Sequence, residues 1–275
     1  VTIDINQFWN LFTESRLASP GQIQTLFSEC DVQSSASQSP ESLAKWIVNR
    51  GALSSYQADI LLAGHHGPFK YGRYSVIEKM SDGPLAGCFS ARDQKTGYGV
   101  ILKFVPGKSV DDLELWNRIE SRCDKISAAA GSAVASTSPS LLAFLNPVFE
   151  AVVLPRHRFV VSAAPAGKSV DRLPRKSRLP WLQACAVMAQ AAKGLQAIHE
   201  RGLLHGGISE SSVWTQPGGE VRLLMDPSAA ECGFASQAKS VQFGQLACLA
   251  PEVDVPVGPK EKLPLTPSAE VYSIG

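Results

Sequence analysis

The hydrophobic pattern of the chain changes at Tyr71, and this change restricts the fold more than any other feature of the sequence. Between residues 5 and 64, apolar side chains recur every three or four positions, which is the spacing of helices that pack on one face. After Tyr71 come short β-branched runs separated by Gly, Pro and Asp, a pattern typical of strands joined by turns. The sequence therefore predicts a helical block followed by a strand-rich segment.

The residues after Tyr71 also predict the order of the remaining elements. Strands are expected at 74–77, 88–92, 99–105, 148–154 and 158–162, and helices at 111–126 and 181–199. The stretch 127–140 is rich in small residues and is expected to be a loop. We therefore expect an α+β, two-lobe protein, with five antiparallel strands and one helix followed by a mainly helical lobe, all preceded by a small helical segment.

Composition argues against several classes of protein. The chain has 275 residues, 44% of them hydrophobic, which is enough to form a core without disulfides or metal. It carries 26 Lys and Arg against 25 Asp and Glu, so it has no basic field that would attract nucleic acid, and we expect no such partner. Its six cysteines are widely spaced, without the C-x-x-C pairs of zinc sites, and are expected to be reduced thiols.

The sequence carries no signal for export or for membrane insertion. No apolar run reaches the roughly 18 residues that a membrane helix needs, and the first residues lack a basic and apolar leader, so we expect a cytoplasmic location. The chain starts at Val1 rather than Met and stops at Gly275 within an apolar stretch. We therefore expect a fragment of a longer protein, which leaves open a membrane anchor beyond Gly275.

Several short motifs follow one another in a distinctive order. They are a glycine-containing turn at 80–88, Lys103 on the third strand, Glu120 on the next helix, the run His199-Glu200-Arg201-Gly202-Leu203-Leu204-His205, Ala250-Pro251-Glu252, and residues 268–275. In this order the motifs resemble those of the protein kinase superfamily, and the match covers Gly72 to Gly275. Residues 43–64 are similar to the helical lead-in of some bacterial eukaryotic-like serine/threonine kinases, which favours a bacterial signalling protein.

The resemblance implies a fold, a domain division and a set of site residues. It implies a kinase-like domain at residues 71–275, incomplete at its C-terminus, after a helical segment and linker at residues 1–70. It implies that ATP is a possible cofactor and assigns its contacts to Gly83, Lys103, Glu120 and Ser162, with Glu120 as the partner of Lys103. It assigns structural roles to His205 and Glu252.

The positions that would carry the chemistry depart from the family pattern. Kinases have an aspartate as catalytic base, a lysine two residues later and a metal-binding asparagine five residues after the base; here those positions hold Gly207, Ser209 and Ser212. Strict spacing places Met225 in the slot of the metal-binding aspartate, whereas a shift of one residue places Asp226 there. The resemblance therefore makes a Mg²⁺ site doubtful and predicts no catalytic residue.

These departures lead to three hypotheses about function. The first is a pseudokinase that acts as a regulator or scaffold in bacterial signalling and therefore has protein partners. The second is an atypical active serine/threonine kinase that transfers phosphate from ATP, retains Lys103, Glu120 and Asp226, and uses Glu210 as its base. The third is a helical interaction module at residues 1–64 carried on an inert kinase fold.

Overall fold

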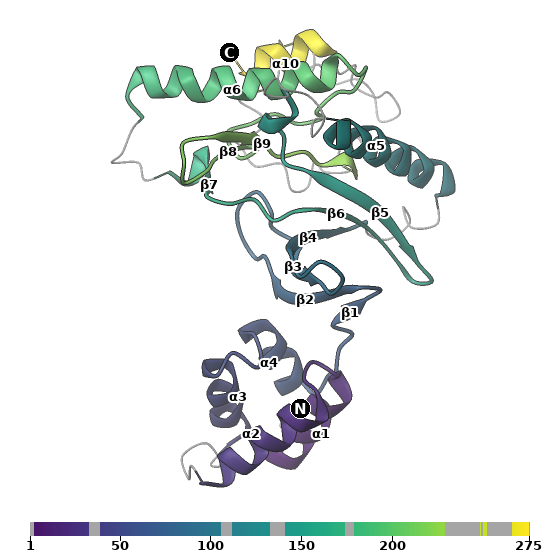
Figure 1. The fold of residues 1–275 in the computed structure, drawn as a ribbon, viewed down its shortest axis with the longest axis vertical. Helices are drawn as coiled ribbons and strands as arrows, with labels where there is room; N and C mark the ends of the chain where they lie inside the picture. Colours follow the sequence, from purple (N-terminus) through teal and green to yellow (C-terminus); the bar gives the residue numbers. More distant parts are fainter. Residues whose placement is uncertain are drawn as a thin grey trace. The chain divides into compact units, whose positions relative to one another are not determined.

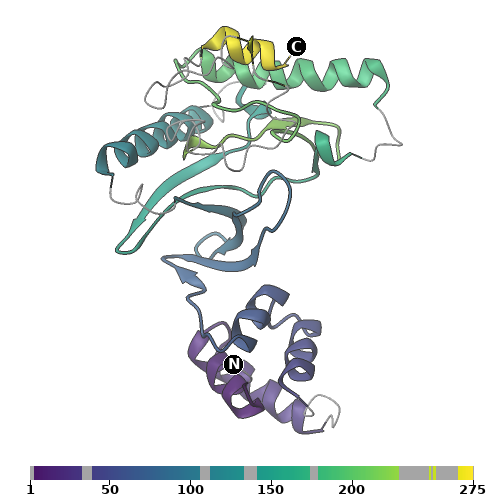
Figure 2. The same cartoon turned by 180° about the vertical axis from the view of Figure 1, so that it is seen from behind.

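The computed structural model describes residues 3–32, 39–105, 112–132, 141–173, 179–228, 248, 250–251 and 266–274 (Figures 1 and 2). The chain divides into two compact units. The first contains Val1–Ser81 and Gly87–Val100, and the second contains Asp82–Ala86 and Ile101–Gly275. Each unit has its own cluster of buried apolar side chains.

The first unit begins with four helices, coloured purple to blue in Figure 1. They are α1 (Ile5–Ser15), α2 (Pro20–Val32), α3 (Pro40–Asn49) and α4 (Ser55–Leu62). Three of them begin with a capping box, in which a side chain before the helix and a glutamine three residues later each satisfy the other's backbone N–H group. Asp4 and Gln7 form this box at α1, Ser19 and Gln22 at α2, and Ser54 and Gln57 at α4.

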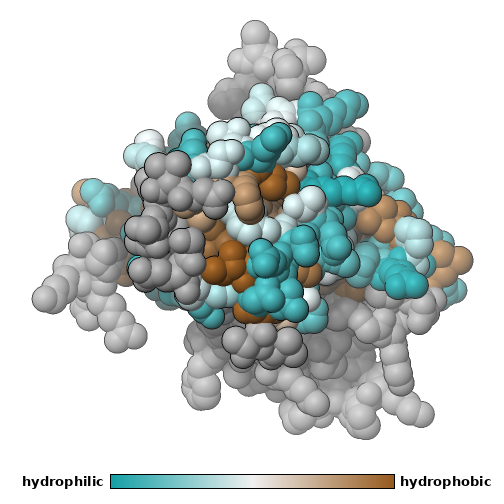
Figure 3. All heavy atoms as spheres, turned by 90° about the horizontal axis from the view of Figure 1, so that it is seen from below, coloured by the Kyte–Doolittle hydropathy of each residue, from teal (hydrophilic) through white to brown (hydrophobic). Residues whose placement is uncertain are grey.

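The helical spacing in the sequence corresponds to the buried face of these helices. Phe8, Phe12, Leu43, Ile47 and Leu61 are all 0% exposed and belong to one apolar cluster. The predicted helices before residue 64 are therefore confirmed. Phe27 on α2 remains 47% exposed, and Figure 3 shows apolar side chains gathered among hydrophilic ones on the face of the molecule that it draws.

Three strands complete the first unit: β1 (Lys70–Tyr71), β2 (Tyr74–Lys79) and β3 (Phe89–Asp93). They pair antiparallel, with Tyr74 opposite Asp93 and Lys79 opposite Phe89. Between Val76 and Glu78 the register shifts, so Ile77 is an extra residue in β2. Strand β1 was not predicted, because two residues are too few to show an alternating pattern.

Strand β4 (Gly99–Phe104) leads into the second unit, where helix α5 (Leu113–Ser132) and strands β5 (Val148–Leu154) and β6 (His157–Ala163) follow. Among the described residues, the six strands of this antiparallel sheet are in the order β1-β2-β3-β4-β6-β5. The five predicted strands are confirmed. Helix α5 continues beyond the expected end at 126 because alanine is the strongest helix former, so the expected loop at 127–140 begins too early.

The rest of the second unit consists of short strands and two longer helices. They are β7 (Lys168–Ser169), β8 (Val213–Thr215), β9 (Val221–Leu223), the 3-10 helices η4 (Leu141–Phe144) and η5 (Val170–Arg172), α6 (Trp181–His199) and α10 (Pro267–Ile274). Helix α6 has the predicted bounds and lies beside α10 in both ribbon views. Gly194 lets α6 approach η4, since a Cβ there would lie 2.9 Å from the Phe144 carbonyl oxygen.

Among the described helices, none is long and apolar enough to cross a membrane. The core of the second unit joins α5, α6 and both sheets through side chains such as Trp116, Ile119, Ile198 and Leu223, each at most 2% exposed. This core holds the segments on which the candidate site residues lie.

Candidate functional site

The structure brings Lys103 of β4 together with Asp226, which follows β9. Their Nζ and Oδ2 atoms form an ion pair, with side chains that are 38% and 30% exposed. The other carboxylate oxygen of Asp226, Oδ1, accepts hydrogen bonds from Ser228, at 3.1 Å from its backbone nitrogen and 2.6 Å from Oγ. Both oxygens of Asp226 are therefore engaged by the protein itself.

The two candidates for the metal-ligand slot lie in different surroundings. Met225 is 4% exposed and belongs to the apolar core of the second unit. Asp226 directs its carboxylate to Lys103 instead. Of the two residues, Asp226 is therefore the one that lies beside the lysine.

Two charged residues of helix α5, Glu120 and Arg122, lie in different surroundings. Glu120 is exposed, and its pairing with Lys103 stays a prediction. Arg122 is only 8% exposed and lies on the buried face of α5 with Ile119 and Cys123. Sequence reasoning missed Arg122, although its spacing from the apolar positions 115, 119 and 126 places it on the inward face.

Arg122 and Asp226 act electrostatically on the same neighbours. The pKa of the Cys123 thiol is raised to about 12, mainly by burial and by the nearby Asp124, with Asp226 contributing to the rise and Arg122 opposing it. Arg122 and Asp226 also act in opposite directions on the pKa of His205. The positively charged guanidinium group of Arg122 therefore contributes to the electrostatic environment of His205, together with Asp226.

The glycine-containing turn, which holds the predicted ATP contact Gly83, is bound by an arginine of η5. Gly83 has a φ of 74°, which favours glycine, and a Cβ there would lie 3.1 Å from Nη2 of Arg172. Nη1 of Arg172 donates to Asp82 at 3.2 Å, and the Ala86 N–H group donates to the Gly83 carbonyl at 3.0 Å. The turn is therefore tight, and a guanidinium group covers its glycine.

Ser162 lies near the end of β6, opposite Val148 of β5. The next residue, Ala163, uses both of its backbone groups: its N–H group donates to the Pro147 carbonyl at 2.8 Å, and its carbonyl accepts from Asn146 Nδ2 at 2.9 Å. The end of β6 is therefore bound to the segment before β5.

His205 begins the loop that resembles the kinase catalytic loop. Its Nε2–H group donates to the Leu224 carbonyl at 2.9 Å, which leaves Nδ1 as a buried acceptor without a hydrogen-bond partner among the described residues. Burial, the largest influence, holds the pKa of His205 below its ordinary value. The neutral imidazole thus connects this loop to the chain two residues before Asp226.

Gly207, Ser209 and Ser212 stand where kinases have catalytic groups, and the two serines are held by hydrogen bonds within the loop. Gly207 has a φ of 157°, a backbone conformation that residues with a Cβ rarely adopt. The Ser212 hydroxyl donates to the Ser209 carbonyl at 2.8 Å and accepts from the Ser209 N–H group at 3.0 Å, while Ser209 Oγ contacts Ser211 Oγ at 2.7 Å. Ser209 and Ser212 are 4% and 7% exposed.

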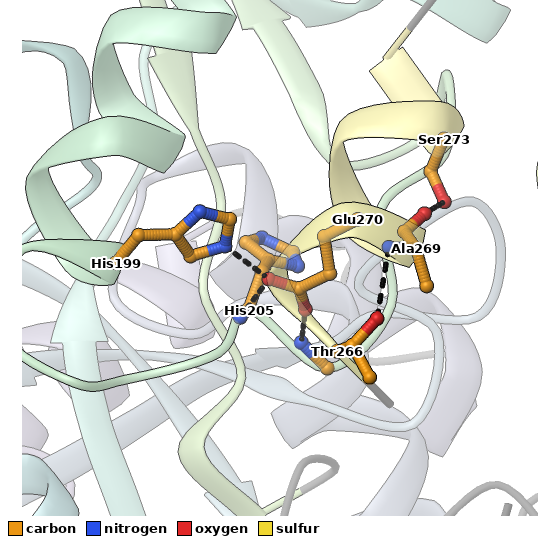
Figure 4. Close-up of polar contacts among 7 residues, drawn as sticks. His199, His205, Thr266, Ala269, Glu270 and Ser273 are labelled. Atoms are coloured by element: carbon orange, nitrogen blue, oxygen red, sulfur yellow. Dashed lines mark hydrogen bonds and ion pairs between the residues drawn. The ribbon is translucent and has the colours of Figure 1, made fainter. Parts of the chain in front are cut away.

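Glu270 of α10 supports the start of the same loop (Figure 4). Its Oε2 atom accepts from the His205 N–H group at 2.9 Å and lies 2.8 Å from His199 Nε2, while Oε1 accepts from the Gly206 N–H group at 2.6 Å. Glu270 is 1% exposed. Glu270 lies in the segment 268–275 that resembles the kinase family, but no local pattern shows that its side chain would bind a loop 64 residues earlier.

Glu252, expected to be structural, lies outside the described residues, although Ala250 before it is 1% exposed. Within the part of the chain that the structure describes, no cluster of three or more His, Cys, Asp or Glu side chains is placed to hold a metal ion. The structure thus brings Lys103 together with Asp226. It also places His205, Ser209 and Ser212 on one loop, which is hydrogen-bonded to the backbone of Leu224, two residues before Asp226.

Comparisons with known proteins find similarity to serine/threonine-protein kinases. No family model matches the chain. It is 23% identical over 215 residues, 78% of its length, to the serine/threonine-protein kinase shk2 of Schizosaccharomyces pombe. It is 31% identical over 120 residues, 42% of its length, to the serine/threonine-protein kinase drp72 of Corynebacterium efficiens. The chain contains a protein kinase-like domain.

The similarity covers only part of these relatives. The matched region spans 34% of the fission yeast protein and 22% of the corynebacterial one. Among solved structures, the kinase domain of a Mycobacterium tuberculosis PknI mutant aligns with a TM-score of 0.46 at 16% identity, covering 58% of this chain and 62% of that one.

Proposed function

We propose that the kinase-like domain is a pseudokinase, which acts through binding rather than phosphoryl transfer. One observation carries the proposal: Glu270 and His205 hold the loop in place, yet its base position is Gly207, which has no side chain. General-base assistance contributes about 10² to 10⁴ to the rate of such a reaction. A loop that keeps its structural hydrogen bonds but lacks the catalytic base is suited to maintain the fold of a binding domain.

The surroundings of Asp226 support the same proposal. A kinase metal ion needs carboxylate and amide oxygens that are open to it. Asp226 uses Oδ2 for Lys103 and Oδ1 for Ser228, and the Ser212 hydroxyl is bonded to Ser209. These groups do not fit a Mg²⁺ ion without rearrangement. The ammonium group of Lys103 has three N–H donors and is partly exposed, so it suits a nucleotide phosphate while it keeps its bond to Asp226. We therefore propose ATP binding through Lys103 that does not depend on Mg²⁺.

The proposed role is a regulator or scaffold for protein partners in bacterial signalling in the cytoplasm. Residues 1–70 would form the helical segment and linker, and residues 71–275 the kinase-like domain. The compact units do not follow this boundary, because the first unit joins the helices to β1, β2 and β3. The boundary at residue 70 therefore marks where the kinase-like motifs begin, and it is not the edge of a compact unit.

Phosphotransfer from γ-labelled ATP to a generic acceptor protein tests the proposal in the whole chain. We expect no transfer by the native protein, because its base position has no side chain. We also expect none by Gly207→Asp, because the Asp226 oxygens remain engaged and the new Cβ strains the loop at a φ of 157°. Transfer by the native protein that Glu210→Ala abolishes would establish the atypical kinase instead. Glu210 is exposed, so this substitution should leave stability unchanged.

Thermal unfolding with ATP, in EDTA and in Mg²⁺, tests the nucleotide part separately. A ligand at 100 times its dissociation constant stabilises the folded protein by about 2.7 kcal/mol. We expect the same shift in both conditions and its loss in Lys103→Met. A shift that requires Mg²⁺ would contradict the proposed role of Asp226, and no shift would leave a scaffold without nucleotide.

A further inference from the structure

Helix α4 of the helical block, defined here as residues 3–62, bonds directly to strand β2. Gln57 Nε2 donates to the Val76 carbonyl at 2.7 Å, and this bond is buried. Ser54 Oγ donates to the carbonyl of Ile77, the extra residue of β2. A register shift frees strand carbonyls from regular pairing, so these two acceptors are available to a helix.

The same two side chains also start the helix. Ser54 Oγ accepts from the Gln57 N–H group at 3.1 Å, and Gln57 Oε1 accepts from the Ser54 N–H group at 2.9 Å. The amide of Gln57 thus caps α4 with its oxygen and binds β2 with its nitrogen. Loss of the strand contact therefore disturbs the start of the helix, and the reverse also holds.

Apolar and aromatic contacts strengthen this junction. Tyr56 of α4 and Phe89 of β3 have ring centroids 6.0 Å apart in an edge-to-face arrangement. Phe69, just before β1, is 3% exposed within the core of the helical block, and its carbonyl accepts from the Val76 N–H group at 2.8 Å. The helical block and the β2–β3 pair are therefore joined by side chains and by backbone.

The β2–β3 pair carries the glycine-containing turn at its end. The Met80 N–H group donates to the Cys88 carbonyl at 2.9 Å, and the Gly87 N–H group donates to the Met80 carbonyl at 2.8 Å. These bonds close the base of the turn, and all three residues belong to the same compact unit as the helices. A displacement of β2 therefore reaches the base of the turn without crossing a flexible linker.

We propose that the helical block controls the glycine-containing turn through Gln57 and Ser54, so that the position of α4 determines how the base of the turn is held. This inference rests on the proposed function only in treating the turn as part of the nucleotide site. It makes the helical block a regulatory element of the kinase-like domain, in contrast to an interaction module on an inert spacer.

A pair of matched substitutions tests the inference. Gln57→Glu keeps an oxygen to cap α4 but replaces the donor to Val76 with an acceptor. Gln7→Glu makes the same change in the capping box of α1, where the side chain accepts from Asp4. Hydrogen exchange is measured for the amides of Met80 and Gly87 in the whole chain.

We expect roughly tenfold faster exchange at Met80 and Gly87 in Gln57→Glu, because a buried acceptor loses its donor, and less than about a twofold change in Gln7→Glu. The affinity for ATP in EDTA should fall only in Gln57→Glu. Unchanged exchange at both amides in a folded Gln57→Glu protein would overturn the inference.

Two further arms keep the test decisive. If Gln57→Glu does not fold, Tyr56→Leu removes the ring contact with Phe89 instead and should also accelerate exchange at Met80 and Gly87. If the native chain binds no ATP, the nucleotide part of the proposed function fails, while the exchange measurement still decides whether the helices hold the turn. Equal effects of Gln57→Glu and Gln7→Glu would show general loosening and contradict the inference.

Discussion

The two halves of the loop from His205 to Ser212 differ in what holds them. Glu270 binds the backbone N–H groups of His205 and Gly206 from another helix. Beyond Gly207, the side chains of Ser209, Ser211 and Ser212 bond within the loop itself. The first half therefore depends on a carboxylate from another helix, whereas the serines that replace catalytic groups of kinases are held by hydroxyl bonds within the loop and by the Leu224 N–H group, which donates to the Ser212 carbonyl at 2.7 Å.

Removal of the long-range support should give the largest effect. Glu270→Ala leaves two buried backbone N–H groups and His199 without their acceptor, and we expect a loss of about 3–5 kcal/mol in the free energy of unfolding, measured in urea. Glu200→Ala is the matched control: it removes an exposed glutamate that accepts from Gln196 and should change stability by less than about 0.5 kcal/mol. Similar losses in both variants would contradict the role of Glu270 as a buried support of the loop.

The second prediction concerns pH and the same support. His205 has a lowered pKa in the folded protein because it is buried, whereas in the unfolded chain the pKa is near 6.5. Below pH 6.5 the unfolded chain therefore binds more protons, so the free energy of unfolding should fall as the pH drops toward the folded pKa and stay level above about 6.5.

The slope of this fall can reach about 1.4 kcal/mol per pH unit. Urea unfolding between about pH 7.5 and 5 measures it. His205→Gln should flatten the slope, whereas substitution of the exposed His66 by Gln should leave it in place. A slope that persists in His205→Gln would assign it to other groups.

The smallest effect is expected at the Lys103–Asp226 ion pair. Its partners are 38% and 30% exposed, so water screens the attraction, and such pairs contribute about 0.2–1 kcal/mol. A double-mutant cycle of Lys103→Met and Asp226→Asn should give a coupling energy in that range. A coupling energy above about 2 kcal/mol would contradict this prediction, because it would mean that the ion pair stabilises the fold as strongly as a buried contact does.

Periodicity predicted most of the fold because the buried faces follow it. The bounds of α6 and the strands from β2 to β6 correspond to local patterns of apolar residues and turns. The extent of α5 was missed because alanines allow both a helix and a loop, and β1 because it has only two residues. These errors arise where a segment has little apolar side chain to bury.

The sequence predicted which residue types stand at the candidate positions better than it predicted how their side chains are arranged. The sequence alone located Lys103, Gly207 and the serines that follow it. It did not decide between Met225 and Asp226, since one buried and one partly exposed residue side by side satisfy the same pattern. It did not indicate the buried position of Arg122, because charged residues on helices are usually exposed and an inward arginine is the exception.

The contacts between α4 and β2 also bear on the order of folding. Gln57 and Val76 are separated by 19 positions in the sequence, whereas Lys103 and Asp226 are separated by 123. The entropy lost in closing a loop grows with its length, and contacts between near positions form faster. We therefore expect the helices and the β2–β3 pair to become native first, providing an ordered strand edge before Lys103 meets its distant partner.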